Sequence, residues 1–246
     1  MLQAPLTGSQ DLNGAARLLP LERFQGSLGQ RVYQSLKHAI LTLAYRPGDI
    51  IRKPEVCERL GVSRSPVADA VARLGADGLV DVVPQAGTFV TRLSMTDIRE
   101  GAFIREAIEV AAAELVAATI TEEHLRELRR NLRLQEALVA DGDPQGFMQL
   151  DGQMHEMMLS FTGFPRLPQV SQTAWLSVHR ARQLILPIEG RLQATLEEHR
   201  QILAAFEAHD PVAARTAVQH HLRQLLTYLQ PLERDHPEFF SAPGQP

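Results

Sequence analysis

Four residues in the second half of the chain combine metal-ligating side chains with helical spacing. Asp151 and His155 stand four positions apart, so both lie on one face of a helix. That face also carries apolar residues, as do the faces of His199 and His221, whereas the neighbouring His220 falls on a polar face. All four side chains should therefore be buried, and a buried polar group without a partner costs roughly 1–3 kcal/mol.

One divalent transition-metal ion could be the shared partner of all four groups. Three imidazoles and one carboxylate suit Zn²⁺ above all, and also Ni²⁺, Mn²⁺ or Fe²⁺, with positions left for water or a ligand. For any one of these histidines taken alone, a hydrogen-bonded core residue is the simpler interpretation. A metal held here could also be purely structural, so these interpretations stay open at this point.

A metal-dependent hydrolase is the main alternative function, since an open metal position also supports catalysis. Such an enzyme needs a general base beside the bound water, but His155-Glu156 lacks the second histidine of a His-Glu-x-x-His motif. A di-iron bundle needs repeated Glu-x-x-His, and the sequence has one example, from Glu233 to His236. We therefore expect a protein that is not an enzyme.

A second set of polar residues stands where a short helix is predicted to begin. Ser63, Arg64 and Ser65 form this set, with Ser65 as the expected N-cap. An arginine at such a helix start can donate two hydrogen bonds to a guanine edge, and serines can contact phosphates. The predicted DNA contacts also include Lys53, which stands before the preceding helix. They further include Gly87, which lies in a turn and would let the backbone approach DNA closely. The same residue types are also common as caps and surface groups.

The elements around this second set predict a winged helix-turn-helix at residues 26–93. Apolar residues at helical spacing indicate a first helix that ends before the turn Pro47-Gly48-Asp49, and a second from about Pro54 to Leu60. A third helix follows, and two strands at Leu79–Val83 and Thr88–Arg92 form a β-hairpin. Three helices and a hairpin in this order are typical of the winged fold.

The metal-ligand candidates fall in a predicted all-α antiparallel bundle at residues 95–230. Its expected helices are 95–119, 121–140, 144–162, 166–186, 189–208 and 211–230. The connections are short, which favours antiparallel neighbours. Residues 1–25 lack periodicity and are expected to be a flexible arm, and residues 231–246 a loose tail. The predicted fold class is therefore mostly α.

Composition is consistent with a cytoplasmic protein that has no membrane span. The 246 residues include one cysteine, Cys57, and no long uninterrupted apolar run or signal peptide is visible. Residues 26–93 hold nine Lys and Arg against six Asp and Glu, a local charge of +3, although the whole chain carries −4. The remainder carries −7, so a basic module joined to an acidic one favours binding of double-stranded DNA.

The predicted winged module resembles the DNA-binding domain of the GntR family. The resemblance rests on Arg46-Pro47-Gly48-Asp49, on Leu60-Gly61-Val62-Ser63-Arg64-Ser65-Pro66-Val67, on Leu74 to Leu79, and on Gly87-Thr88-Phe89-Val90. It implies a homodimer that binds a short palindromic operator. The chain departs from the family at Ala68, where an arginine is usual, at Pro54, where a basic residue is frequent, and in Asp81 at the wing base. Each lost phosphate contact should weaken DNA affinity and flatten its salt dependence.

Residues 95–230 resemble the FCD effector domain of FadR-type GntR regulators. The matching positions are Arg105 to Glu109, Asp151-x3-His155, Glu198-His199-Arg200, and His221, which follows His199 by 22 residues. Many members carry an Asp and three His here as metal ligands. The resemblance therefore implies that Asp151, His155, His199 and His221 bind the metal.

The effector implied by a metal-containing sensor is a small organic acid that completes the coordination sphere. Arg105 is the predicted effector contact, because it shares a helical stripe with apolar residues and an inward arginine can clamp a carboxylate. A structural salt bridge is the alternative role for Arg105, and Arg180 and Arg182 are further candidates for the pocket. The sequence thus predicts a DNA-binding repressor or activator that is gated by an effector.

Overall fold

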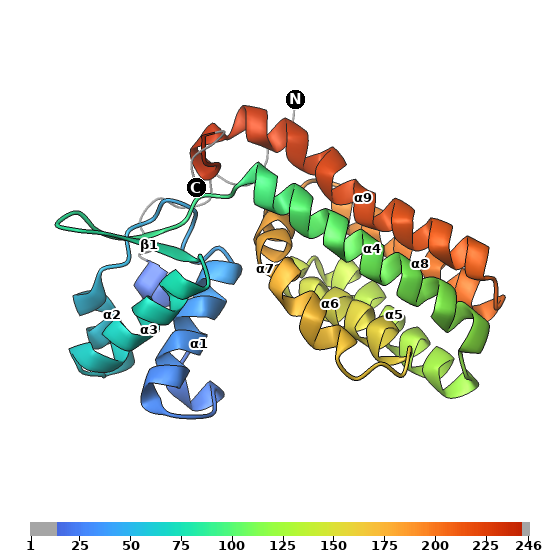
Figure 1. Cartoon of the computed structure of the whole chain (residues 1–246), viewed down its shortest axis with the longest axis horizontal. Coiled ribbons are helices and arrows are strands. Elements are labelled where there is room, and N and C mark those ends of the chain that lie inside the picture. Colours follow the sequence, from blue (N-terminus) through green and yellow to red (C-terminus); the bar gives the residue numbers. More distant parts are fainter. Residues whose placement is uncertain (1–13, 243–246) are drawn as a thin grey trace. The chain divides into compact units, whose positions relative to one another are not determined.

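The computed structural model describes residues 14–242, which fold into two compact units (Figure 1). Within these residues, one unit comprises residues 96–232, and the other comprises residues 14–95 together with 233–242. The fold is mostly helical with one two-stranded sheet, which confirms the predicted fold class.

The smaller unit contains the predicted helix-turn-helix and wing. Its main elements are α1 (Leu28–Leu41), α2 (Lys53–Leu60), α3 (Arg64–Ala76), β1 (Val80–Val83) and β2 (Gly87–Val90). The side chain of Ser27 caps α1 by accepting a hydrogen bond from the backbone of Gln30. Gly61 ends α2 in the left-handed conformation, with φ of 64°. The strands pair antiparallel, with Val80 opposite Val90.

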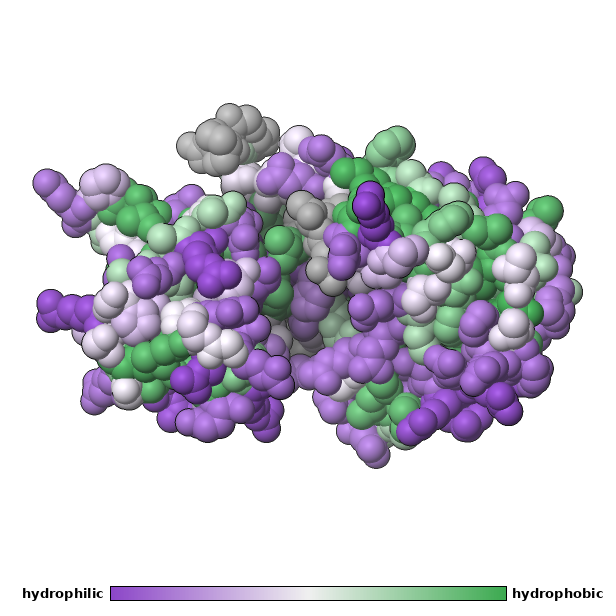
Figure 2. Space-filling view, turned by 60° about the horizontal axis from the view of Figure 1, so that its bottom comes forward, coloured by the Kyte–Doolittle hydropathy of each residue, from purple (hydrophilic) through white to green (hydrophobic). Residues whose placement is uncertain are grey.

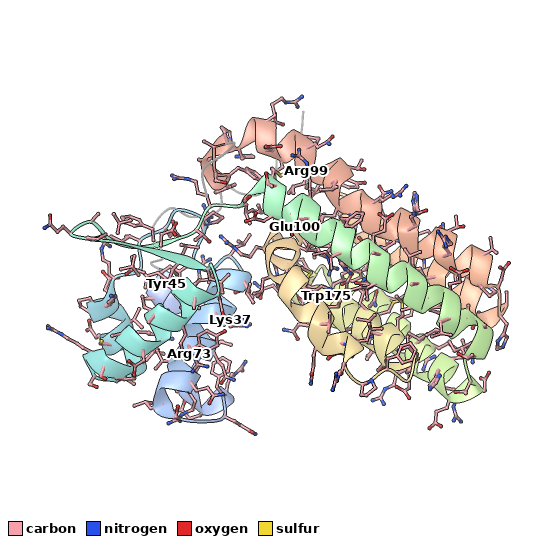
Figure 3. The ribbon with its side chains drawn as sticks, viewed as in Figure 1. Lys37, Tyr45, Arg73, Arg99, Glu100 and Trp175 are labelled. Atoms are coloured by element: carbon pink, nitrogen blue, oxygen red, sulfur yellow. The ribbon has the colours of Figure 1, made fainter. Side chains whose placement is uncertain are left out.

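The α1–α3 packing fixes the orientation of α3. Val32, Leu36, Val67 and Leu74 are completely buried in the shared core. On the surface, the guanidinium of Arg73, which Figure 3 labels on α3, lies 4.7 Å from the centre of the Tyr33 ring. The helix that carries the predicted base contacts is therefore held by both apolar and polar contacts.

The described part of the N-terminal segment is packed against this unit, so the predicted flexible arm is wrong for residues 14–25. Two short 3₁₀ helices, Gly14–Arg17 and Leu21–Arg23, form there. Leu18 is 2% exposed within the core, and the Ser35 hydroxyl donates to the Leu19 carbonyl at 2.8 Å. The apolar residues of this segment lack a regular period because they belong to short turns. Residues 1–13 lie outside the described residues.

The described part of the C-terminal segment is also ordered, contrary to the predicted loose tail at 231–246. Helix α9 continues through Pro231 to Asp235, and a 3₁₀ helix follows at Pro237–Phe239. Phe239 and Phe240 are buried, and the Phe239 carbonyl accepts a hydrogen bond from the Leu93 amide at 2.9 Å. Burial of these two aromatic rings stabilises the C-terminal segment. Residues 243–246 lie outside the described part.

The larger unit is a helical bundle with all six predicted helices. These are α4 (Met95–Thr119), α5 (Glu122–Asp141), α6 (Pro144–Ser160), α7 (Leu167–Ile185), α8 (Arg191–Glu207) and α9 (Pro211–Asp235). Thr121 and Asp143 cap α5 and α6, each accepting a hydrogen bond from the amide three residues on. Helix α5 packs against both α6 and α8. Phe147 and Phe206 are completely buried in the core between them.

The surface carries hydrophilic residues interspersed with apolar ones, as the space-filling view shows for one face (Figure 2). Among the described residues, no helix combines the length and apolar character that crossing a membrane requires. The interior of the bundle is unusual in a different way, because several charged side chains are buried there among apolar ones.

Candidate functional site

The predicted DNA-contact residues lie on three elements of the smaller unit. Ser63 is the N-cap of α3, which corrects the expected cap at Ser65, and its side chain makes no capping hydrogen bond. Ser63, Arg64 and Ser65 are all exposed at the start of α3, whereas Lys53 is half-buried at the start of α2. Gly87 opens β2 with φ of 138°, a conformation that disfavours other residues. DNA contact by these five residues remains a prediction.

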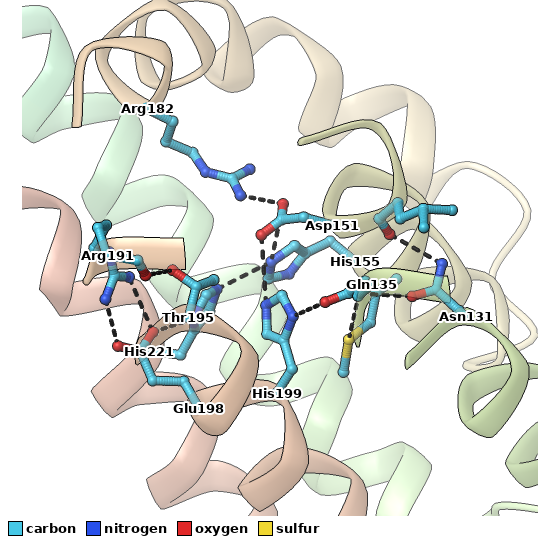
Figure 4. Close-up of polar contacts among 12 residues, drawn as sticks. Asn131, Gln135, Asp151, His155, Arg182, Arg191, Thr195, Glu198, His199 and His221 are labelled. Carbon is cyan, nitrogen blue, oxygen red and sulfur yellow. Dashed lines mark hydrogen bonds and ion pairs between the residues drawn. The ribbon is translucent and has the colours of Figure 1, made fainter. Parts of the chain in front are cut away.

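The four predicted metal ligands come together inside the bundle (Figure 4). Asp151 and His155 come from α6, His199 from α8 and His221 from α9, and one potential ligand atom of each lies within 4.8 Å of the other three. Nε2 of His155 lies 3.1 Å from Nε2 of His221. Nε2 of His199 lies 3.4 Å from Oδ1 of Asp151. All four residues are buried, so the cluster is built into the core.

The opposite edge of each imidazole ring faces an oxygen acceptor. Nδ1 of His155 lies 2.6 Å from Oε2 of Glu109 on α4. Nδ1 of His221 lies 2.7 Å from Oε2 of Glu198 on α8. Nδ1 of His199 lies 2.7 Å from Oε1 of Gln135 on α5 (Figure 4). The hydrogen bonds to Gln135 and Glu198 place the proton of neutral His199 and His221 on Nδ1, so their lone pairs are on Nε2. Nδ1 of His155 is close to Oε2 of Glu109 but is not aligned for a hydrogen bond, so only the charge of the carboxylate favours a proton there.

The protonation states of Asp151, His199 and His221 suit metal ligands. Burial lowers the pKa of His221 to about 4, although the hydrogen bond to Glu198 acts in the opposite direction. Burial and the adjacent His221 hold the pKa of His199 well below its ordinary value. Burial raises the pKa of Asp151, but the attractions of Arg182 and of the three histidines together outweigh this and hold the pKa well below its ordinary value. Neutral imidazoles and an ionised carboxylate are the forms that bind metals.

Two atoms of the cluster that lack a hydrogen-bond partner show whether these residues fit a metal ion. Oδ1 of Asp151 and Nε2 of His199 are buried and lack a hydrogen-bond partner within the described part of the chain. An ionised oxygen and a nitrogen lone pair repel each other at 3.4 Å, as do the two Nε2 lone pairs of His155 and His221. A cation at the point where these atoms converge satisfies all of them. The donor set therefore fits a divalent transition metal.

A small cavity of about 20 Å³ adjoins the cluster at His221. Three arginines line it, namely Arg105 of α4, Arg182 of α7 and Arg191 of α8. Each is buried and each is paired with a carboxylate: Arg105 with Glu109, Arg182 with Asp151, and Arg191 with Glu198. The volume holds about one water molecule. A larger guest would need side chains to move.

Two arginine nitrogens at the cavity remain available for a further acceptor. Nη2 of Arg105 and Nε of Arg191 are buried and lack a hydrogen-bond partner among the residues described. The guanidinium of Arg105 also lies 5.1 Å from the ring centre of Trp175, on α7 (Figure 3). Arg105 therefore lies at the cavity. It also forms a salt bridge with Glu109, which was the alternative role predicted for it from the sequence. Effector contact remains a prediction.

Several residues of this site were not identified from the sequence. Arg182 does line the cavity and Arg180 does not, although the sequence offered both. Arg191, Gln135 and the roles of Glu109 and Glu198 were missed. A signal existed, because Glu109 follows Arg105 by four positions and Glu198 follows Arg191 by seven, both on buried helix faces.

Comparison with known proteins gives two matching family models that together cover both units. The model described as "Bacterial regulatory proteins, gntR family" matches residues 28–90. The model described as "FCD domain" matches residues 100–224, which is half of the chain.

The curated relatives are transcription regulators rather than enzymes. The HTH-type transcriptional repressor RspR of Escherichia coli is 28% identical over 214 residues, covering 87% of this chain and 94% of RspR. An uncharacterized HTH-type transcriptional regulator in an unstable DNA locus of Streptomyces ambofaciens is 30% identical, covering 86% of this chain and 89% of its own. The solved structure of E. coli McbR/YncC has a TM-score of 0.71 at 23% identity, covering 85% of this chain and 99% of McbR, which shows the shared fold.

Proposed function

Because the chain belongs to the gntR family of bacterial transcriptional regulators and carries an FCD domain, we propose that a small carboxylate and a divalent metal ion together set its affinity for an operator. The observation that carries this proposal is the convergence of three Nε2 atoms and the Asp151 carboxylate in a buried cluster. The three cavity arginines beside that cluster supply the binding partner for the carboxylate.

On the DNA side, the N-terminus of α3 enters the major groove and reads base edges. Arg64 donates two hydrogen bonds to a guanine, and Ser63 and Ser65 contact phosphates. Lys53 and the Gly87 turn hold the neighbouring backbone. The chain acts as a homodimer whose two winged heads contact half-sites about 34–36 Å apart. Since RspR is named a repressor, repression is the mode we propose for this chain.

On the metal side, Asp151, His155, His199 and His221 hold Zn²⁺, with Ni²⁺, Mn²⁺ and Fe²⁺ as further candidates. Zinc is favoured because four nitrogen and oxygen donors from three helices satisfy its tetrahedral preference. When bound, the ion supplies a positive charge and a coordination position for an anionic ligand. The ion also joins α6, α8 and α9, so its presence favours one packing of these helices.

The effector is a small organic acid whose carboxylate meets the cavity arginines. Arg105 and Arg191 each keep one buried nitrogen without a hydrogen-bond partner in the described residues, and a carboxylate can accept from both. Binding of the acid to one helix arrangement better than to another shifts the population of arrangements. A shift in the FCD domain then changes how the two winged heads engage the operator.

The test uses a duplex that the zinc-loaded, full-length protein selects from a random-sequence pool. Fluorescence anisotropy gives the Kd of that duplex with and without acetate, lactate or pyruvate. At least one acid should change Kd by about 5–150-fold, the usual range of allosteric coupling. The His199→Ala variant should bind the duplex without responding to the acid. The control variant His220→Ala changes an exposed histidine next to a metal ligand and should respond as the wild type does.

Two results would contradict the proposed function. If no acid changes Kd while the zinc stays bound, the gating fails and the metal is structural. If the zinc-loaded protein converts any of these acids with multiple turnovers, the FCD domain is an enzyme and effector sensing is the wrong description.

A further inference from the structure

Two glutamates each join a cavity arginine to a histidine of the metal cluster. We infer that Glu109 and Glu198 are positioning residues that couple the two sites: an anion bound to the arginines raises the metal affinity of His155 and His221, and the metal raises the affinity for the anion. This inference rests on the proposed function, because it concerns how the same two ligands act on each other.

The first link runs through the two oxygens of one buried carboxylate. Nε of Arg105 donates to Oε1 of Glu109 at 2.6 Å, and Oε2 of the same carboxylate lies 2.6 Å from Nδ1 of His155. Glu109 is 0% exposed, so solvent does not screen its electrostatic interactions with Arg105 and His155. Burial raises the pKa of Glu109, but Arg105 and His155 more than offset this and bring the pKa to about 2. The carboxylate therefore lies between the Arg105 guanidinium, which donates to it, and the His155 ring, which is at ion-pair distance.

The second link has the same order of groups on another helix. Nη1 and Nη2 of Arg191 donate to Oε1 and Oε2 of Glu198 at 2.6 and 3.0 Å. Oε2 of Glu198 also accepts from Nδ1 of His221 at 2.7 Å. The Tyr228 ring lies 4.8 Å from the guanidinium carbon of Arg191 and stacks on that cation. Arg105 and Arg191 line the same cavity, so one anion there meets both links.

The third histidine provides an internal comparison. Nδ1 of His199 faces Oε1 of Gln135, which is a neutral amide. The nitrogen of Gln135 donates to Oδ1 of Asn131 at 2.7 Å, and that asparagine donates in turn to the Leu150 carbonyl at 3.0 Å. This chain of hydrogen bonds contains no arginine. The Nδ1 side of His199 is therefore positioned without an arginine, and the Arg182–Asp151 pair is what connects its Nε2 side to the cavity.

The direction of coupling follows from how a carboxylate divides its charge. A guanidinium draws electron density from the carboxylate and weakens it as an acceptor for the imidazole N–H. An anion at the arginine competes for that cation, so the carboxylate accepts more strongly from Nδ1 and Nε2 becomes a better donor to the metal. In reverse, a metal on Nε2 makes the N–H more acidic and strengthens its bond to the carboxylate, which loosens the hold on arginine. Linkage requires both effects to be equal in size.

The first test measures the Zn²⁺ affinity of the full-length protein against a chromophoric chelator, with and without saturating acetate. In the wild type, acetate should raise the affinity at least about 5-fold, the lower end of typical coupling. Glu109→Gln and Glu198→Gln should each lower the basal affinity about 10–100-fold, as loss of outer partners of metal ligands does. In the double variant, acetate should lose most of its effect on the affinity, because the Arg182–Asp151 pair is then the remaining charged connection between the cavity and the cluster.

Matched controls come from two arginine–glutamate pairs that are partly exposed and lie outside the cavity and the cluster. Glu106 lies on α4 and accepts from Arg223, and Glu136 lies on α5 and accepts from Arg200. Glu106→Gln and Glu136→Gln should keep both the basal zinc affinity and the acetate effect. If the double variant keeps the full acetate effect, acetate acts by ligating the metal or through the Arg182–Asp151 pair, and the coupling through the two glutamates is overturned. If the wild type fails to bind zinc, the proposed function itself fails.

A second measurement uses the wild type alone and so does not depend on variants that fold. With ¹⁵N-labelled histidine and zinc bound, the Nδ1–H proton resonances of His155 and His221 should move downfield on addition of acetate, because Glu109 and Glu198, less attracted by their arginines, draw the Nδ1 proton more strongly. The Nδ1–H resonance of His199 should stay in place. Equal shifts for all three histidines, or shifts in none, would overturn the assignment.

Discussion

Nε2 of His155 lies 3.1 Å from Nε2 of His221, while Nδ1 of each ring is directed at a carboxylate oxygen, 2.6 Å away for His155 and 2.7 Å for His221. The carboxylates place the proton of each neutral ring on Nδ1, so two lone pairs face each other in the core. Close lone pairs repel unless a cation lies between them. The outer carboxylates therefore organise the imidazoles for a metal ion, which is how outer partners orient metal ligands.

The metal-free protein should lose stability as the pH falls. The pKa of His221 is about 4 in the folded chain because burial disfavours its charged form, whereas an unfolded histidine titrates near 6.5. Between these values the unfolded chain binds a proton that the folded chain does not, so the free energy of unfolding falls as the pH is lowered. The full effect of this one group is roughly 3 kcal/mol.

Urea unfolding of the metal-free, full-length protein checks this, followed by the fluorescence of Trp175, the single tryptophan of the chain. The midpoint should fall between about pH 7 and pH 5. His221→Gln should flatten that dependence, and His220→Gln, at an exposed position, should leave it unchanged. A midpoint that is constant over this range in the wild type would contradict the assigned protonation states.

The metal ligands could be predicted from the sequence because each one interrupts an apolar helical stripe. Asp151 and His155 share a face with buried residues of α6, and His221 lies among buried residues of α9, so the 3.6-residue period alone indicated that they point inward. The fold class followed from the same periodicity and from short connections. Resemblance to a known effector domain then selected these four residues as a set.

The outer partners and the ordered ends could not be predicted in the same way. Glu109 and Gln135 reach His155 and His199 from other helices, and a pairing between helices depends on how they pack rather than on any spacing within one helix. Residues around Leu18 and Phe239 form short 3₁₀ turns that have no amphipathic period to detect. Their order comes from tertiary burial, which sequence periodicity does not reveal.

Arg64 should determine specificity for one base pair of the operator. Arg64→Ala should cost about 1–3 kcal/mol on the preferred duplex and should reduce discrimination at that base pair, because two hydrogen bonds to a guanine edge are lost. Binding to the selected duplex and to its single-base variants, measured by anisotropy, checks this. Arg130→Ala, at an exposed arginine of the bundle, should change neither quantity. A uniform loss over all duplexes would instead make Arg64 a phosphate contact.

Trp175 should report carboxylate binding in the cavity. Its ring lies 5.1 Å from the Arg105 guanidinium, so an anion that draws this cation changes the field at the indole. Acetate should therefore change the emission of the zinc-loaded protein saturably, and Arg105→Gln should abolish the change. Arg130→Gln is the control. If calorimetry detects acetate binding while the emission stays constant, the acid binds elsewhere.

Leu18 should contribute to the stability of the winged unit, although it lies in the segment expected to be mobile. Leu18 is 2% exposed, so Leu18→Ala should cost about 2–5 kcal/mol, the usual range for a buried leucine. Leu28, which is 41% exposed, provides a matched substitution that should cost much less. Urea unfolding followed by far-ultraviolet circular dichroism measures both. Equal, small effects would mean that the segment is not part of the core in solution.

Calorimetric titration of Zn²⁺ into metal-free, full-length protein tests the central claim most directly. The cluster predicts one zinc site per chain. Zinc binding should release protons, and the dependence of the heat on the buffer measures how many. His199→Ala should lose that site while keeping its helical circular dichroism, and His220→Ala should keep it. Absence of saturable zinc binding in the folded wild type, or undiminished binding in His199→Ala, would contradict the account.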